Sequence, residues 1–180
     1  IYIYVKEFNT LIEIDPTPVH NDYINVFNQK LRNFSNPYRQ RVKTEVANEH
    51  GYRCVHIFDW DNIDAVISII NKNTIRVYGR NCNILEVNAK DANAFFSENH
   101  LQSTCRGILK CYALEYQGDI VQMMAFDKPR YNSNYDWELL RLCSKSGVSV
   151  IGGASKLYTH AKRNEVSNII SYCDYSKFNG

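Results

Sequence analysis

The stretch from Leu11 to Asp22, L-I-E-I-D-P-T-P-V-H-N-D, constrains this chain more than any other. It begins as an apolar strand and then places Asp15, His20 and Asp22 on a loop that two prolines stiffen. Carboxylates at the C-terminal end of a strand can hold magnesium or manganese with a water, and a nearby His can exchange protons near neutral pH. The same pattern also occurs in ordinary surface loops, so both readings stay open.

Length and composition place the chain among globular proteins with one large domain or two small ones. It has 180 residues and a formal net charge of +2, which neither requires nor excludes a nucleic-acid partner. No apolar run approaches membrane-spanning length and no signal peptide begins the sequence, so we expect a cytoplasmic protein without a membrane partner. The six cysteines lie far apart and never form C-x-x-C, which favours buried free thiols.

The first part of the chain alternates between strand-like and helical patterns. Residues 1–5 and 10–14 are typical of a β-hairpin, and residues 52–58 of a buried strand. Helices are predicted over 20–34, over 38–50, where Tyr38, Val42 and Val46 recur every four residues, and from Asp61 or Asn62, either of which can cap the helix. In that last helix, Ile63, Val66, Ile67 and Ile70 form the stripe predicted to face the core.

The second part has a different order of strands and helices. It predicts extended segments over 74–87, a helix that Asn88 and Asp91 cap, and a hairpin around Gln117-Gly118. Two further strands, a helix over 154–164 and a last strand over 168–173 follow. We therefore predict an α/β (α+β) protein with domains over 1–73 and 74–180, the first with a mixed sheet.

The first domain resembles phage homing endonucleases of the EDxHD group, which are related to very-short-patch-repair nucleases and the PD-(D/E)xK fold. The matching segments are Y-I-Y-V-K-E-F-N-T-L-I-E-I-D-P-T-P-V-H and R-V-K-T-E-V-A-N-E-H-G-Y-R-C-V-H-I-F-D-W-D. The resemblance implies a metal-dependent, site-specific DNA endonuclease that uses Mg²⁺ (or Mn²⁺). The chain departs from the family pattern in two places. The first metal Asp of the family would directly precede Ile1, and Pro16–His20 replaces the usual glycine-aromatic-Trp-His turn. They imply a domain clipped at its N-terminus and an altered turn.

The second domain resembles a GNAT-like αβ layer that follows the nuclease part in many such phage proteins. The segments are F-F-S-E-N-H-L-Q, M-M-A-F-D-K-P-R, Y-D-W-E-L-L-R-L-C, S-V-I-G-G-A-S-K-L and I-I-S-Y-C-D. The resemblance implies a domain, clipped at its C-terminus, that serves DNA contact or packing rather than acyl transfer, and we assign it no cofactor-binding residues. Gly152-Gly153 before a helix suits either an anion site or a tight turn.

The resemblance assigns roles to several residues of the first domain. Glu13 and Asp15 are the expected metal ligands, and residues i and i+2 of a strand share a face, so they can converge on one ion. Glu13, His20 and Lys43 are the expected catalytic residues, with His20 as general base and Lys43 stabilising the developing phosphorane charge. Asp22, Asp59 and Asp61 are weaker candidates, and His56 is read as a core or edge residue.

Basic and aromatic residues supply the expected contacts with double-stranded DNA. Arg39 and Arg41 precede the helix lysine, and Lys128, Arg130 and Tyr131 share one loop. Such side chains can follow phosphates or stack on a base. Taken singly, each also reads as ordinary surface charge.

Three hypotheses follow from the sequence. The first is a homing-type endonuclease that acts as a monomer or homodimer in a phage-infected bacterial cell. The second is a sequence-specific DNA-binding protein whose nuclease site has decayed. The third is a GNAT-type acyltransferase, which E-L-L-R-L and V-I-G-G-A-S-K-L motivate.

Overall fold

The computed structural model describes residues 2–16, 38–71, 74–174 and 177. By contacts the chain divides into two compact units. Unit 1 comprises Ile1–Val66 with Cys173–Gly180, and unit 2 comprises Ile67–Tyr172. The C-terminal residues thus fall with the first unit, whereas the sequence analysis placed them in the second domain.

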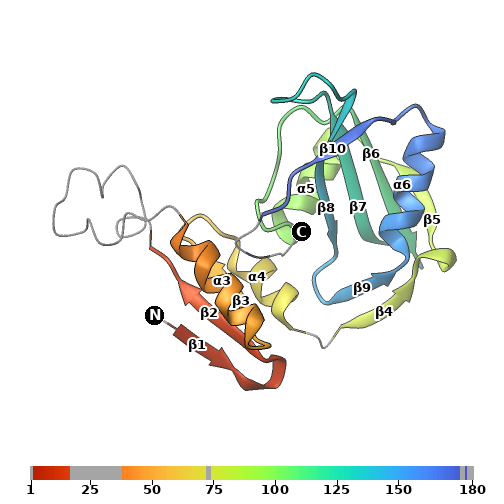
Figure 1. Ribbon diagram of the computed structural model, residues 1–180. Coiled ribbons are helices and arrows are strands. Elements are labelled where there is room, and N and C mark those ends of the chain that lie inside the picture. The colour runs from red at the N-terminus through yellow and green to blue at the C-terminus, as the bar shows by residue number, and fades with distance from the viewer. Residues whose placement is uncertain (1, 17–37, 72–73, 175–176, 178–180) are drawn as a thin grey trace. The chain divides into compact units, whose positions relative to one another are not determined.

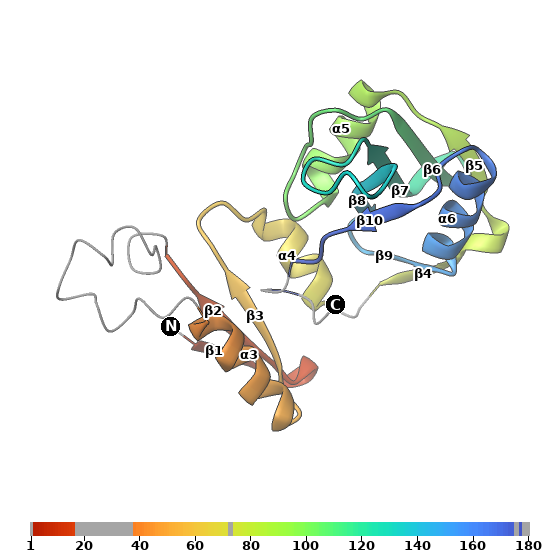
Figure 2. The same ribbon diagram turned by 45° about the horizontal axis from the view of Figure 1, so that its top comes forward.

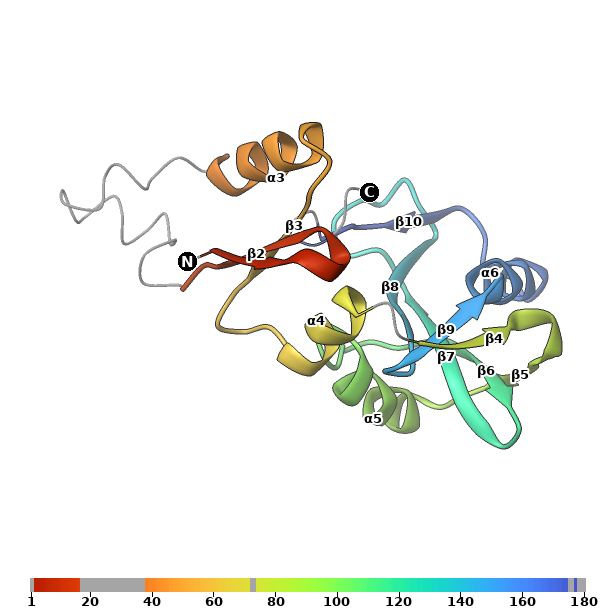
Figure 3. The same ribbon diagram turned by 90° about the horizontal axis from the view of Figure 1, so that it is seen from below.

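Unit 1 is built on a three-stranded sheet in the order β1-β2-β3 (Figure 1). Its elements are β1 (Tyr2–Val5), η1 (Lys6–Phe8), β2 (Thr10–Ile14), α3 (Arg39–Glu49) and β3 (Arg53–Ile57). β1 and β2 are antiparallel, whereas β2 and β3 are parallel. Helix α3 lies along one face of this sheet (Figure 3). The carboxyl ends of β2 and β3 therefore meet at the same edge.

Unit 2 holds a five-stranded sheet in the order β10-β8-β7-β6-β5 (Figure 2). These strands are β5 (Asn83–Glu86), β6 (Lys110–Tyr116), β7 (Asp119–Asp127), β8 (Trp137–Ser144) and β10 (Ile169–Ser171). A separate parallel pair joins β4 (Ile75–Tyr78) to β9 (Val148–Ile151). The helices are α4 (Ile63–Ile70), which begins in unit 1, α5 (Ala89–Asn99) and α6 (Gly153–Arg163), with η3 at Gly79–Asn81.

The core of unit 2 lies on both faces of this sheet, because successive residues of β6 and β7 alternate between two apolar clusters. Tyr112 and Leu114 join the cluster that contains Leu157 of α6. Cys111 and Ala113 join the cluster that contains Phe96 of α5. Since both faces are covered, these strands read as continuous apolar runs rather than as alternating ones.

Most of the predicted elements are confirmed within the described ranges. The mixed α and β class is confirmed, as are the hairpin of β1 and β2, the hairpin at Gln117-Gly118, and the cap of α5, where Asn88 Oδ1 accepts from the Asp91 amide at 3.0 Å. The helix predicted over 20–34 lies outside the described residues. The nuclease-like and GNAT-like identities of the two units stay predictions.

The predicted core face of α4 is wrong at two of its four positions. Val66 and Ile70 are buried, but Ile63 is 47% and Ile67 54% exposed. Ala65, which the predicted stripe did not include, is buried. Helical spacing of apolar residues does not by itself ensure burial, because apolar residues often remain on a protein surface.

Of the two residues predicted as possible caps of α4, Asn62 takes the role and Asp61 does not. Asn62 Oδ1 accepts from the Ala65 amide at 3.2 Å and so caps α4. Asp61 Oδ2 instead accepts from the Phe58 amide at 2.8 Å and pairs with Lys177 Nζ at 2.9 Å. Both side chains of this pair are almost completely buried. A buried ion pair with a residue far along the chain leaves no sequence-local signal.

Candidate metal centre

The candidate site begins with the register of two parallel strands in unit 1. Glu13 of β2 lies opposite His56 of β3, so the two side chains leave the sheet on the same face. Asp15 follows β2 and shares that face, and its amide donates to the Ile57 carbonyl at 2.8 Å. This bond extends the strand pairing past the end of β2. It therefore fixes the direction in which the Asp15 carboxylate points.

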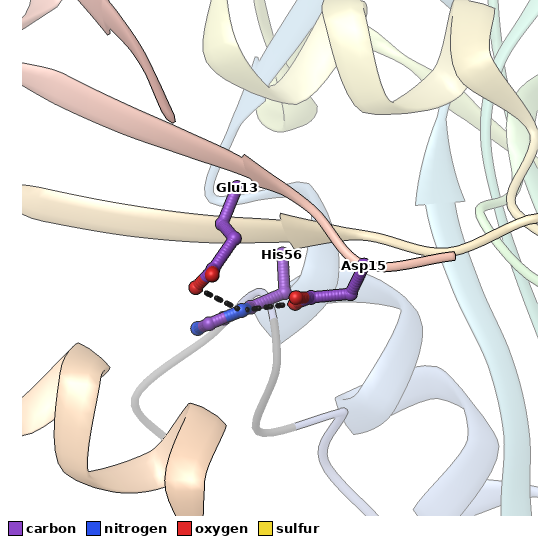
Figure 4. Close-up of side chains that lie close together, drawn as sticks. All are labelled: Glu13, Asp15 and His56. Carbon is purple, nitrogen blue, oxygen red and sulfur yellow. Dashed lines mark hydrogen bonds and ion pairs between the residues drawn. The ribbon is translucent and has the colours of Figure 1, made fainter. Parts of the chain in front are cut away.

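Glu13, Asp15 and His56 converge (Figure 4). His56 Nδ1 lies 2.7 Å from Asp15 Oδ2 and 3.5 Å from Glu13 Oε2. One ligand atom from each residue lies within 4.8 Å of the other two. The side chains are thus close enough to share one divalent ion.

Helix α3 covers the side of the site that faces away from the sheet, where two consecutive residues contact the cluster. Lys43 Nζ forms an ion pair with Glu13 Oε1. Thr44 Oγ1 lies 3.0 Å from His56 Nε2, and Cys54 Sγ lies 3.6 Å from the same nitrogen. Consequently the carboxylates face one nitrogen of the imidazole, while a hydroxyl and a thiol face the other.

The cluster is buried, so its charges interact strongly. The side chains of His56 and Asp15 are 0% exposed and that of Glu13 is 4% exposed, whereas Lys43 is 20% exposed. Burial by itself lowers the pKa of His56, but hydrogen bonds to Asp15 and Cys54 and the charge of these groups outweigh it and raise the pKa to about 9. Two carboxylates therefore face two cations, Lys43 and protonated His56, unless a metal ion takes the place of the imidazole proton.

The donor set fits a divalent ion. Carboxylate oxygens suit magnesium and manganese, and an imidazole nitrogen suits transition ions. Glu13 Oε2 is buried and makes no hydrogen bond within the described part of the chain. Buried carboxylate oxygens are normally satisfied, so this oxygen is available as a ligand.

Three of the residues that the sequence analysis predicted for the site lie together in the structure. Glu13, Asp15 and Lys43, which the sequence analysis chose as ligands and catalytic lysine, lie together around the cluster. His20 and Asp22 fall outside the described residues. Asp59 is not a member of the cluster, and Asp61 is bound to Lys177.

Sequence reasoning missed the part that His56 and Thr44 play in this cluster. His56 does lie in the interior, as expected, but its ring contacts both carboxylates rather than apolar neighbours alone. The available signal was its place near the end of an apolar strand that runs beside the strand of Glu13. Thr44 follows Lys43 in the matching segment R-V-K-T, but its contact with His56 depends on the placement of α3 and could not be read from that match.

The predicted DNA-binding residues lie on both units. In unit 1, Arg41 of α3 is exposed and forms an i,i+4 pair with Glu45 at 2.8 Å, and Arg39 begins the same helix. In unit 2, Lys128 Nζ lies 4.6 Å from the centre of the Trp137 ring. Both arginines lie on the helix that also carries Lys43.

The loop before β8 presents the remaining DNA candidates. The Arg130 amide donates to buried Glu138 at 2.9 Å, and its guanidinium donates to the Arg106 carbonyl at 2.7 Å. Tyr131 is 84% exposed and meets Tyr172 edge-to-face at 6.1 Å. The backbone contacts hold the loop while Tyr131 points into solvent.

The Gly152-Gly153 pair is explained by backbone conformation at Gly152 and by close packing at Gly153. Gly152 has φ +72°, a left-handed conformation that favours glycine. A Cβ on Gly79 would lie 2.9 Å from Gly153 Cα, so the two backbone segments touch. Lys156 Nζ of α6 donates to the carbonyls of Gly79 and Cys82, which holds η3 against the start of the helix. The tight-turn reading accounts for both glycines.

Comparisons with known proteins found no matching family model, no matching curated protein and no matching solved structure. None of the helices within the described ranges is long and apolar enough to cross a bilayer.

Proposed function

We propose that this protein is a metal-dependent endonuclease for double-stranded DNA, with its catalytic centre in unit 1. The single observation that supports it is the convergence of Glu13, Asp15, His56 and Lys43 at the carboxyl ends of two parallel strands. Phosphodiester hydrolysis needs this combination, because acidic ligands hold a metal while a cation meets the charge on the phosphate.

Glu13 and Asp15 would hold the ion, Mg²⁺ or Mn²⁺, which supplies Lewis-acid activation of a phosphate oxygen and a water of lowered pKa. Lys43 would stabilise the negative charge that develops on the phosphate, and its ion pair with Glu13 keeps the ammonium beside the ligands. Because Lys43 is the most exposed member of the cluster, a phosphate would approach from its side. His20 is proposed as the general base.

Basic side chains would hold the DNA by its phosphates. Arg39 and Arg41 lie on the same helix as Lys43, so they would contact the backbone near the scissile bond. Lys128, Arg130 and Tyr131 of unit 2 would provide a second contact, which fits site-specific cleavage of the homing type. The protein would act as a monomer or a homodimer.

The test is cleavage of plasmid and candidate phage DNA by the chain with Mg²⁺, with Mn²⁺ and with EDTA. A version that carries any residues its gene encodes before Ile1 is assayed in parallel. We expect metal-dependent cutting that Glu13→Gln abolishes, since the amide keeps the shape and loses the ligand charge. Glu49→Gln changes an exposed acid at the end of α3 and should cut like the unchanged protein.

A second candidate is a DNA-binding protein without nuclease activity, which the charge balance of the cluster favours. With His56 protonated, Lys43 and His56 neutralise both carboxylates without any ion. DNA binding without cutting under every metal condition would remove the nuclease and leave this candidate. We do not propose acyl transfer, because the left-handed conformation of Gly152 and the packing of Gly153 against Gly79 already explain the two glycines.

A further inference from the structure

The two ring nitrogens of His56 face different partners. Nδ1 lies 2.7 Å from Asp15 Oδ2 and 3.5 Å from Glu13 Oε2, so both carboxylates aim at it. Nε2 lies 3.0 Å from Thr44 Oγ1 and 3.6 Å from Cys54 Sγ. An ion held by the two carboxylates would therefore meet Nδ1, and Nε2 is turned away from it (Figure 4).

Thr44 offers an acceptor that can hold the ring proton on Nε2. A hydroxyl oxygen accepts a hydrogen bond, and the nitrogen opposite a metal-bound nitrogen normally donates to such an acceptor. If Nε2–H donates to Thr44 Oγ1, the lone pair of the neutral ring lies on Nδ1, beside the carboxylates. Thr44 is 2% exposed, so water does not compete for this bond.

We propose that His56 is the third ligand of the metal site through Nδ1, and that Thr44 is the positioning residue that holds the imidazole in the required tautomer. This inference rests on the proposed function, because it completes the ligand set of the same site. A ligand set of two carboxylates and one imidazole selects a first-row transition ion such as Mn²⁺ over Mg²⁺, since magnesium prefers oxygen ligands and retains its waters.

The first experiment detects the nitrogen directly on Mn²⁺ bound to the full chain. Electron spin-echo envelope modulation should show coupling to one imidazole ¹⁴N, and the pattern should change when histidine is labelled with ¹⁵N. The coupling should vanish in His56→Asn and persist in His50→Asn, which alters an exposed histidine at the end of α3. Because the labelling needs no substitution, the test stands even if His56→Asn fails to fold.

The second experiment separates positioning from general stability. Thr44→Val removes the acceptor while keeping the side-chain shape, and Mn²⁺ affinity should fall about 10- to 100-fold. Thr44→Ser restores the hydroxyl and should recover the affinity. Thr159→Val, an exposed change on α6, should leave it unchanged. A merely structural Thr44 would lower the unfolding midpoint without changing the affinity of the folded protein for Mn²⁺.

Two results would overturn the inference, namely bound Mn²⁺ without imidazole coupling and the absence of Mn²⁺ binding. An unchanged Mn²⁺ affinity in Thr44→Val would remove the positioning role. DNA cleavage without ¹⁴N coupling would reject the inference and retain the nuclease. Imidazole coupling without DNA cleavage would retain the ligand set and reject the nuclease, so the two failures are distinguishable.

Discussion

Both units bury apolar side chains, but unit 1 also buries a cluster of charged groups. In unit 2, both faces of the central sheet carry apolar clusters, with Leu114 and Phe126 on one face and Ala113 and Phe96 on the other. In unit 1, charged and polar side chains are buried where α3 meets the sheet. These are Glu13, Asp15, Thr44 and His56.

The difference matters because charges and apolar groups have opposite effects when they leave water. Apolar burial stabilises a fold by roughly 25 cal/mol per Å², whereas a buried charge costs several kcal/mol unless it is paired. The ion pairs around Glu13 and Asp15 offset that cost and contribute little net stability. Apolar burial therefore accounts for the two clusters of unit 2, whereas the buried charges of unit 1 are not explained by their contribution to stability.

The largest expected effect comes from breaking the charge pairing of unit 1. Asp15→Asn removes the nearer of the two carboxylates that face His56 Nδ1, so Glu13 alone is left to balance both Lys43 and a protonated His56 in the interior. We expect a loss of about 3–5 kcal/mol in the free energy of unfolding, measured by urea denaturation with EDTA present. The matched control is Asp119→Asn, which breaks an exposed pair with Lys145 and should cost less than about 1 kcal/mol. If both variants lost the same free energy of unfolding, the interior charges of unit 1 would be solvated.

The same test in unit 2 removes apolar volume instead of charge. Leu114 is 0% exposed within the cluster against α6, and Leu114→Ala leaves a cavity there. We expect a loss of about 2–5 kcal/mol by urea denaturation, with Leu109→Ala at an exposed position within about 0.5 kcal/mol of the unchanged protein. Cleavage per folded molecule should be unchanged at a permissive temperature. A loss of cleavage at full folding would show that unit 2 takes part in the chemistry.

Local sequence patterns predict the elements of both units well, because the signals of strands, hairpins and caps lie within a few residues. The turn at Gln117-Gly118 and the cap at Asn88 are examples of such local signals. Burial is less predictable, since it depends on what packs against an element. Ile67 has the spacing of a core residue and is nevertheless 54% exposed.

The candidate site likewise contains residues that a local pattern predicts and residues that it does not. Glu13 and Asp15 could be paired from the strand period alone, because residues two apart share a face. His56 is 43 residues beyond Glu13 and joins it only through the parallel register of β2 and β3. Thr44 further requires that α3 lie on this face of the sheet. The roles of His56 and Thr44 thus depend on contacts between segments that are distant in sequence, and such contacts leave no local sequence pattern.

The smallest predicted effect tests a local signal at the edge of unit 2. Asn88 Oδ1 accepts from the Asp91 amide at 3.0 Å, and Asn88 Nδ2 donates to Asp91 Oδ2 at 2.8 Å. Asn88→Ala removes both bonds at the start of α5 and should lower the free energy of unfolding by about 1 kcal/mol. Asn88→Asp keeps an acceptor and should lose less, although its charge lies near that of Asp91. Because α5 covers one apolar cluster, a loss as large as that of Leu114→Ala would mean that this helix governs the folding of the whole unit.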